Sequence, residues 1–356
     1  MGELAKLAGV TPRTLSTYEN MGTTENDSVN IETLSSFADA LKYPIEFFFK
    51  ETIEPLGDDK VSFRAMTKLS AVKKNSALAI GSIGCELNSW IERKFTLPKL
   101  DLFSFEADQF TDPESAAVAL RDYWKLGDLS IKNMVHLLES KGIRVFSLSE
   151  NCKEVDAFSF WMDEKPFVFL NTMKSFERSR FDAAHELGHL VLHKHGECFG
   201  RQAEQEADAF ASSFLMPRST VLSSVPRQPT LARLLELKGK WKVSLSALVR
   251  RSFDLGLSSE WHYRQLNIQL SRLGYRSSEP NGMTERETSL VAEKICDHFR
   301  REGIKRGTIL KEIDIPADEI AALLFKHPFF STAVVSSNTT HHPDHGNVRR
   351  LPVELK

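Results

Sequence analysis

Two histidines four residues apart, His185 and His189, set the strongest limit on how this chain can fold and what it can bind. They stand in the run His185-Glu186-Leu187-Gly188-His189. Residues four apart on an α-helix share a face one turn along the axis, so both imidazoles can contact one metal ion. Glu186 lies beside the first histidine, where its carboxylate can reach a water molecule on that ion. The run therefore predicts a helix, and it is typical of zinc peptidases in which the carboxylate is the general base.

A second predicted helix, Ala203–Met216, supplies two carboxylates. It is rich in helix formers and ends before Pro217. Glu204 and Asp208 are four residues apart and therefore share one face of this helix. We predict that Glu204 is the third metal ligand and that Asp208 accepts a hydrogen bond that orients one of the ligating histidines. Three protein ligands leave the fourth zinc position open for water, as a catalytic site requires.

Three alternatives stay open for this motif. His195 has the spacing of the third histidine in the H-E-x-x-H-x-x-G-x-x-H pattern of the metzincins, but Leu192 stands where that pattern has glycine. The helix is therefore expected to continue, which turns His195 about 240° away from the second histidine. Cys198 is an alternative ligand with soft-metal chemistry. The third alternative is an ordinary surface helix at 185–189, against which the carboxylate helix downstream argues. His193 is interpreted as a helix-end residue whose positive form suits the helix dipole.

Short apolar runs upstream of the motif predict three β-strands. They lie at Arg144–Leu148, Phe158–Met162 and Phe167–Asn171. The turn residues between the second and third runs predict an antiparallel hairpin. Helical patterns dominate the rest of the chain. We therefore predict an α+β, mainly helical fold with a gluzincin-like peptidase core and a small antiparallel sheet.

These motifs resemble the ImmA/IrrE family of metallopeptidases. The resemblance is strongest over Arg178–His193 and over Glu204–Pro217, which ends Phe214-Leu215-Met216-Pro217. It extends outward over most of the chain, through shorter motifs at 124–127, 138–145, 155–159, 234–244 and 256–257.

The resemblance implies one Zn²⁺ ion per chain, with His185, His189 and Glu204 as its ligands and Glu186 as the base. It also implies a cytoplasmic protein of bacteria or phages. Several members of the family cleave a partner helix-turn-helix repressor, so a protein of the Xre type is the expected substrate.

Composition limits the alternatives. A hydrophobic content of 41% and a charged content of 26% are those of a soluble globular protein. The formal net charge of −2 gives no reason to expect nucleic acid or an acidic membrane as a general partner. No signal peptide is visible, and no apolar stretch approaches the roughly 18 residues that span a bilayer. The cysteines are scattered without paired spacing and are interpreted as free thiols of a reducing cytoplasm: Cys85, Cys152, Cys198 and Cys296.

The chain is long enough for two or three compact units. We divide it into a partial helix-turn-helix at 1–50, a helical connector at 51–112, the zinc peptidase core at 113–225, a C-terminal helical domain at 226–335 and a flexible tail at 336–356. The tail contains His341, His342 and His345, which are interpreted as part of a solvated tail rather than as metal ligands.

The first segment resembles an Xre-type helix-turn-helix. A short helix begins at Leu4 and is followed by a glycine turn, an N-cap at Thr11 and Pro12 at the first position of a second helix. This second helix, ending at Asn20, would enter the major groove. The candidate DNA-contacting residues are Thr11, Arg13, Thr14 and Thr17.

The segment departs from that pattern in two ways. Only three residues precede Leu4, so we expect this unit to lack the helix that normally comes first. A start of the protein further upstream would favour DNA binding instead. Residues 1–50 also contain seven acidic and four basic side chains, which gives a net charge of −3. Because DNA binding depends on phosphate neutralisation by basic side chains, we expect weak DNA binding and favour a role in protein interaction.

Taken together, the motifs predict a zinc-dependent endopeptidase that cleaves a regulatory protein, such as a helix-turn-helix repressor, to switch on gene expression. The alternative is a non-proteolytic transcriptional regulator or antitoxin-like binding protein that uses the zinc domain as sensor or scaffold. Glu186 favours the enzyme, because a structural zinc site needs no base at that position. Arg178, Arg180 and His193 are candidates for stabilising the oxyanion, although a structural role is favoured for each.

Overall fold

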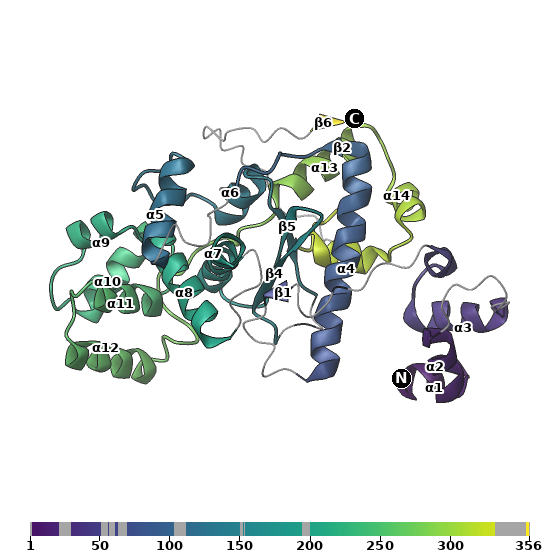
Figure 1. The fold of residues 1–356 in the computed structure, drawn as a ribbon, viewed down its shortest axis with the longest axis horizontal. Coiled ribbons are helices and arrows are strands. Elements are labelled where there is room, and N and C mark those ends of the chain that lie inside the picture. The colour runs from purple at the N-terminus through teal and green to yellow at the C-terminus, as the bar shows by residue number, and fades with distance from the viewer. Residues whose placement is uncertain are drawn as a thin grey trace.

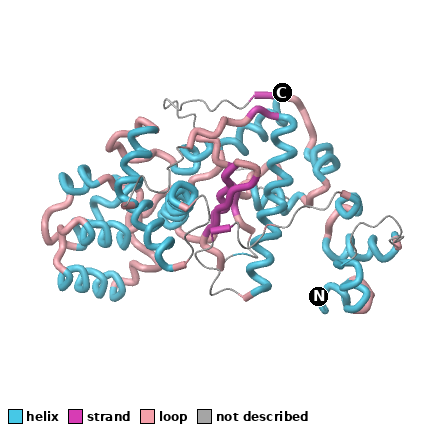
Figure 2. Tube along the Cα trace, viewed as in Figure 1, coloured by secondary structure: helices cyan, strands magenta, loops and turns pink. Residues whose placement is uncertain are grey.

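The computed structural model of the chain describes residues 2–20, 30–50, 56, 61–62, 70–102, 112–149, 152, 154–193, 200–331 and 354–355. As predicted, the fold is α+β and mainly helical (Figures 1 and 2). The N-terminal helices lie at one end of the molecule, a small sheet lies near its middle, and a group of short helices forms the other end (Figure 1). Within the described residues, no helix is long and apolar enough to span a membrane.

Three short α-helices and a 3₁₀ turn form the N-terminal unit: α1 (Gly2–Leu7), α2 (Pro12–Asn20), α3 (Ile31–Leu41) and η1 (Ile45–Phe49). Gly9 has a φ of +67°, which a glycine adopts without strain, and it turns the chain between α1 and α2. Thr11 caps α2, since its Oγ1 accepts a hydrogen bond from the Thr14 amide at 3.1 Å. Leu15 and Phe37 are buried between these helices. The assignment of a helix-turn-helix to this unit stays a prediction.

The central sheet has four strands in the order β1-β4-β5-β3. Their bounds are β1 (Val61–Ser62), β3 (Arg144–Ser147), β4 (Ala157–Met162) and β5 (Lys165–Leu170). The predicted hairpin is present, because β4 and β5 pair antiparallel. Its two turn residues, Asp163 and Glu164, have φ angles of 49° and 58°, as a type I′ turn requires.

The prediction of an antiparallel sheet is wrong at one edge, where β3 pairs parallel with β5. After β3, the chain skips the adjacent strand position in the sheet and forms β4 one position further on. The hairpin then returns β5 into that position, so β5 runs in the same direction as β3. The sheet is therefore mixed. Nothing local in the sequence marks this pairing, because β3 and β5 are not consecutive strands.

Each face of the sheet packs into a different hydrophobic core. Along β5, Phe167 and Phe169 belong to one core, whereas Val168 and Leu170 belong to the other. This alternation follows from the period of two of a β-strand. The phenylalanine side packs against α4 (Ala71–Lys94), and the other side packs against α7 (Phe176–Leu192), as Figure 1 shows.

Small residues let α4 lie close to the phenylalanine layer. The rings of Phe158 and Phe169 are stacked with centroids 4.8 Å apart and planes inclined by 8°. A Cβ atom on Gly84 would lie 2.6 Å from Cζ of Phe169, and one on Gly81 would lie 2.5 Å from Cδ1 of the buried Leu56. Gly84 is therefore required by the close approach of the helix to the sheet, and a side chain at position 81 would displace Leu56. Helix α4 covers part of this face of the sheet.

The remaining helices complete the two cores. On the α7 side lie α5 (Pro113–Tyr123), α6 (Met134–Ser140), α8 (Arg201–Leu215), α9 (Arg218–Ser224), α10 (Leu231–Leu237), η5 (Lys238–Lys240), α11 (Leu245–Asp254) and α12 (Glu260–Arg272). On the α4 side lie α13 (Leu290–Arg301), α14 (Arg306–Ile313) and α15 (Ala317–Leu323). Both cores draw residues from more than one of the five segments defined above.

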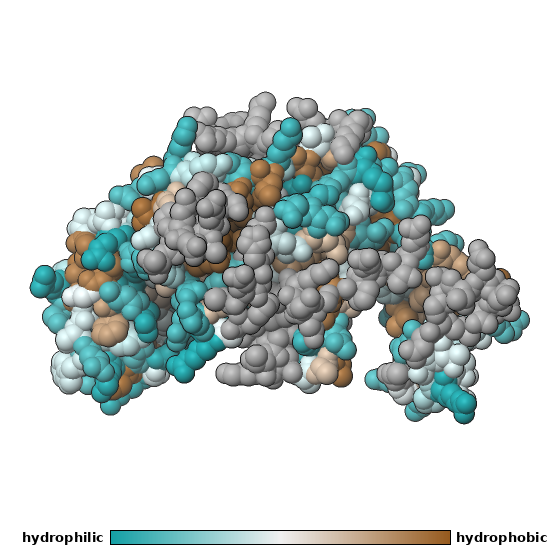
Figure 3. All heavy atoms as spheres, in the orientation of Figure 1, coloured by the Kyte–Doolittle hydropathy of each residue, from teal (hydrophilic) through white to brown (hydrophobic). Residues whose placement is uncertain are grey.

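Two residues near the C-terminus are described. Glu354 and Leu355 form β6, which pairs antiparallel with β2 (Phe95–Thr96). The three histidines of the expected tail, at 341, 342 and 345, lie outside the described residues. On the face shown in Figure 3, the described part of the chain presents hydrophobic side chains as separate patches among hydrophilic ones.

Candidate metal centre

Helix α7 carries the histidine motif and is buried on nearly every side. Ser175 caps its N-terminus, accepting a hydrogen bond from the Arg178 amide at 3.3 Å. One face packs into the core through apolar residues such as Ala184 and Leu187. The opposite, polar face is covered as well, since His185 and Glu186 are each 1% exposed. Burying charged and polar groups is costly unless they have partners, so this face needs an explanation in terms of its contacts.

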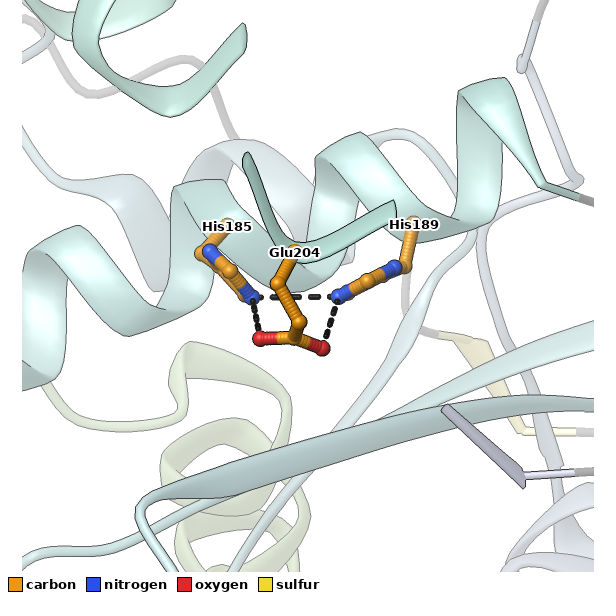
Figure 4. A group of neighbouring side chains, drawn as sticks. All are labelled: His185, His189 and Glu204. Atoms are coloured by element: carbon orange, nitrogen blue, oxygen red, sulfur yellow. Dashed lines mark hydrogen bonds and ion pairs between the residues drawn. The ribbon is translucent and has the colours of Figure 1, made fainter. Parts of the chain in front are cut away.

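The structure brings His185, His189 and Glu204 together, with α7 supplying the histidines and α8 the carboxylate (Figure 4). The two Nε2 atoms lie 3.0 Å apart. Glu204 places Oε2 at 3.5 Å from Nε2 of His185 and Oε1 at 3.3 Å from Nε2 of His189. One ligand atom from each residue lies within 4.8 Å of the others. This spacing lets all three side chains contact a single ion.

The chemistry of these atoms fits a cation. Asp208 places Oδ1 at 2.9 Å from Nδ1 of His185. A carboxylate only accepts hydrogen bonds, so Nδ1 of His185 carries a proton, and in the neutral ring, the form that binds a metal, the Nε2 lone pair faces Glu204. Lone pairs and a carboxylate that converge on one point repel each other unless a positive charge lies between them. Two imidazoles and one carboxylate are the ligand set of many catalytic zinc sites.

The pKa values describe the same environment. Burial alone would lower the pKa of His185, but contacts with Asp208 and Glu204 raise it to about 9. Burial lowers the pKa of His189 to about 4. Burial opposes ionisation of Glu204, but contacts with both histidine rings lower its pKa to about 2. Without a metal ion, the cluster therefore binds one proton. A metal ion that binds there would displace this proton.

A glycine inside the motif sets the distance between the two helices. A Cβ atom on Gly188 would lie 3.2 Å from Cα and 3.3 Å from the carbonyl oxygen of Ala207 in α8. It would also lie 3.1 Å from Cδ1 of Phe210. The backbones of α7 and α8 therefore pass close to each other at this point. This close crossing brings the Glu204 side chain within reach of both histidines.

Replacing Gly188 by alanine is expected to push α8 away from α7, because the added Cβ atom would lie 3.2–3.3 Å from backbone atoms of Ala207. The cost in folding free energy should be about 1–3 kcal/mol, as for other overpacked sites, and zinc affinity should fall as Glu204 retreats. Denaturant unfolding and competition with a chromophoric chelator measure the two effects. Gly307→Ala is the control, since a Cβ atom there meets nothing within 4 Å. Equal zinc affinity in Gly188→Ala and wild type would contradict this account of the crossing.

Glu186 lies beside the cluster and is held by the sheet. Ser159 of β4 donates a hydrogen bond from Oγ to Oε2 of Glu186 at 2.6 Å. Burial raises the pKa of Glu186 to about 7. A carboxyl group with this pKa can both accept and return a proton near neutral pH. Sequence reasoning did not identify Ser159, because only the fold places β4 against α7.

The two arginines that the sequence offered for stabilising the oxyanion, Arg178 and Arg180, form ion pairs with carboxylates. Arg178 pairs with Asp156 at 3.0 Å and Asp182 at 3.1 Å, whereas Arg180 is buried against Glu287. Both arginines are thus engaged in ion pairs, which supports structural roles.

The structure also shows partners for His193 that the sequence analysis missed. Nδ1 of His193 lies 3.1 Å from Nδ1 of His189, and Nε2 of His193 lies 2.9 Å from Oε2 of Glu206. The signal was available, because His193 repeats the four-residue spacing of the motif once more. His195 and Cys198, the alternative ligands, lie outside the described residues.

The candidate DNA-contacting residues lie around the start of α2. Thr11, Arg13 and Thr17 are exposed, and Thr14 is half-buried. They are on the N-terminal unit, separate from the metal cluster.

A model of the family described as the IrrE N-terminal-like domain, a peptidase family, matches residues 138–253. This range includes α7, α8 and every residue of the candidate metal centre. The match supports an ImmA/IrrE-type peptidase in this part of the chain. No curated protein matches the sequence.

Proposed function

We propose that the chain is a zinc-dependent endopeptidase that cleaves a regulatory protein, such as a helix-turn-helix repressor, and thereby switches on gene expression. The observation that carries this proposal is that a possible metal-binding cluster and a possible general base lie side by side in the interior of the protein. His185, His189 and Glu204 form a three-ligand cluster, and Glu186 stands beside them as a separate carboxylate. A purely structural zinc site is closed by four protein ligands and needs no such base.

When bound by His185, His189 and Glu204, zinc supplies Lewis-acid activation of the attacking water and of the scissile carbonyl group. Glu186 accepts the proton of that water and then delivers it to the leaving amine. Ser159 orients the Glu186 carboxylate through its hydroxyl group. With only 1% of its surface exposed, Glu186 is kept out of bulk solvent.

An extended substrate segment is the conformation that this site favours. β4 carries Ser159 toward Glu186, and peptides commonly bind by adding a strand to a sheet. The edge of β4 already pairs with the short strand β1, where Ser62 stands opposite Ser159. A substrate strand would therefore pair beyond β1 or take its place.

The test is cleavage of a defined partner. The purified chain is incubated with purified helix-turn-helix repressors of the Xre type, beginning with any that is encoded beside its gene, and the products are identified by mass spectrometry. We expect discrete fragments with zinc, none after chelation, and the same fragments after zinc is restored. Fragments that persist in chelator would show that the cleavage does not depend on metal. An uncleaved partner that nevertheless binds the zinc-loaded chain would support the non-proteolytic regulator.

The alternative, a DNA-binding or antitoxin-like regulator, is favoured by the exposed side chains at the start of α2. Arg13 is the one basic side chain within this helix, Pro12–Asn20. Each phosphate contact contributes about 0.9 to the salt dependence of binding. With one or two contacts, the slope of log K against log salt should stay below about 2 in magnitude.

A salt titration of binding to the operator of its own gene measures this slope. We expect weak affinity that Arg13→Ala reduces only slightly further. Nanomolar binding with a steep slope, abolished by Arg13→Ala, would instead make the protein a DNA-bound regulator that carries a peptidase.

A further inference from the structure

The two histidines of the cluster have different partners at Nδ1, the ring nitrogen that faces away from Glu204. Nδ1 of His185 contacts the carboxylate of Asp208 directly, at 2.9 Å. Among the described residues, the partner of Nδ1 of His189 is not a carboxylate but Nδ1 of His193, at 3.1 Å. His193 in turn places Nε2 at 2.9 Å from Oε2 of Glu206. A second imidazole therefore stands between His189 and its carboxylate.

The carboxylate at the end of this chain determines where each proton lies. An ionised Glu206 accepts hydrogen bonds and donates none, so Nε2 of His193 carries a proton. In neutral His193 the other nitrogen, Nδ1, is then an acceptor. Its partner, Nδ1 of His189, must be the donor. The remaining nitrogen of His189, Nε2, consequently presents its lone pair to Glu204 and His185.

The surroundings of His193 distinguish it from an ordinary residue at a helix end. Its side chain is 8% exposed, although it lies at the end of α7, where a polar residue could turn to solvent. Its backbone amide donates to the carbonyl of His189 at 3.0 Å, which holds the two residues one above the other. On the other side, Gln202 donates to Oε1 of Glu206 at 2.9 Å and fixes that carboxylate.

We propose that His193 and Glu206 are positioning residues of the metal centre, which set the tautomer and the ring orientation of His189. Asp208 does the same for His185 by direct contact. The inference rests on the proposed metal centre and deepens it. Removing an outer partner of a metal-bound histidine commonly costs 10–100-fold in metal affinity or activity. The relay has two links, so losing either His193 or Glu206 should weaken the hold on His189.

The experiment measures metal binding rather than cleavage. Zn²⁺ affinity is determined for the full chain by competition with a chromophoric chelator, and the visible spectrum of the Co²⁺-loaded protein reports on ligand geometry. We expect His193→Ala and Glu206→Gln to weaken Zn²⁺ binding on the order of 10-fold or more and to alter the Co²⁺ spectrum. His193→Gln, whose amide oxygen can accept from Nδ1 of His189, should recover part of both. Asp208→Asn should give a comparable loss through His185.

Two controls separate positioning from folding. His262→Gln removes a histidine that contacts the carbonyl oxygen of Pro229, away from the cluster, and should leave both readouts unchanged. Metal-free unfolding of every variant identifies losses that come from stability alone. Wild-type Zn²⁺ affinity and Co²⁺ spectrum in His193→Ala would overturn this inference and leave the proposed peptidase intact. A wild-type chain that binds no Zn²⁺ would overturn both.

Discussion

Replacing Glu186 by glutamine is expected to slow cleavage of the partner protein by about 10²-fold or more, while zinc stays bound. The amide has nearly the same volume as the carboxyl group but cannot accept the proton of the attacking water. Ser159 can still donate its hydrogen bond to the amide oxygen, so the side chain should keep its place. Single-turnover cleavage and zinc content, measured on the same preparation, separate chemistry from metal binding.

A matched control comes from a second buried carboxyl group. Glu139 accepts hydrogen bonds from the amides of Leu290 at 2.9 Å and Val291 at 3.2 Å, at the start of α13. Burial raises its pKa to about 7, as it does for Glu186. Glu139→Gln therefore repeats the same chemical change outside the metal cluster and should leave the cleavage rate near that of wild type. If Glu186→Gln cleaved the partner as fast as this control, the proposed peptidase mechanism would be wrong.

Alanine at His185, His189 or Glu204 is expected to reduce bound zinc from about one ion per chain to almost none. Each side chain supplies one of three protein ligands, so the two that remain bind too weakly to keep the metal through dialysis. Elemental analysis after dialysis measures the zinc, and unfolding with and without added zinc measures its contribution to stability. Because a ligand that binds only the folded state stabilises it, only wild type should unfold at higher temperature in added zinc.

The outcome for Glu204 decides between the alternatives. Wild-type zinc content in Glu204→Ala would remove this residue from the ligand set. Loss of zinc in His195→Ala together with retention in Glu204→Ala would favour the metzincin-like arrangement. Asp208→Asn serves as the intermediate case, since it should weaken zinc binding without abolishing it.

The parts of this site that the sequence predicted are those governed by helical spacing. His185 and His189 share a face of α7 because four residues nearly complete one turn, and Glu204 and Asp208 share a face of α8 for the same reason. That the two helices would meet could be inferred only from the chemistry of their side chains, and their close approach depends on Gly188.

The parts that could not be predicted depend on contacts between distant segments. Ser159 reaches Glu186 only because β4 packs against α7, and no periodicity in the sequence encodes that choice of neighbour. The parallel pairing of β3 with β5 is non-local in the same way. His193 is different, since its spacing was visible. It was interpreted through the helix dipole alone, and its partner Glu206 lies on another helix.

The two-sided burial of the sheet bears on which fragment of this protein could fold by itself. The family match spans 138–253, which contains β3, β4 and β5 with their layer of phenylalanines. That layer is covered by α4, which precedes the match, and by α13–α15, which follow it. A fragment cut to the match would expose stacked aromatic rings to water, and exposed apolar patches of this kind promote aggregation. The smallest autonomous folding unit should therefore reach from α4 to α15, because helices outside the match cover the face of the sheet opposite α7.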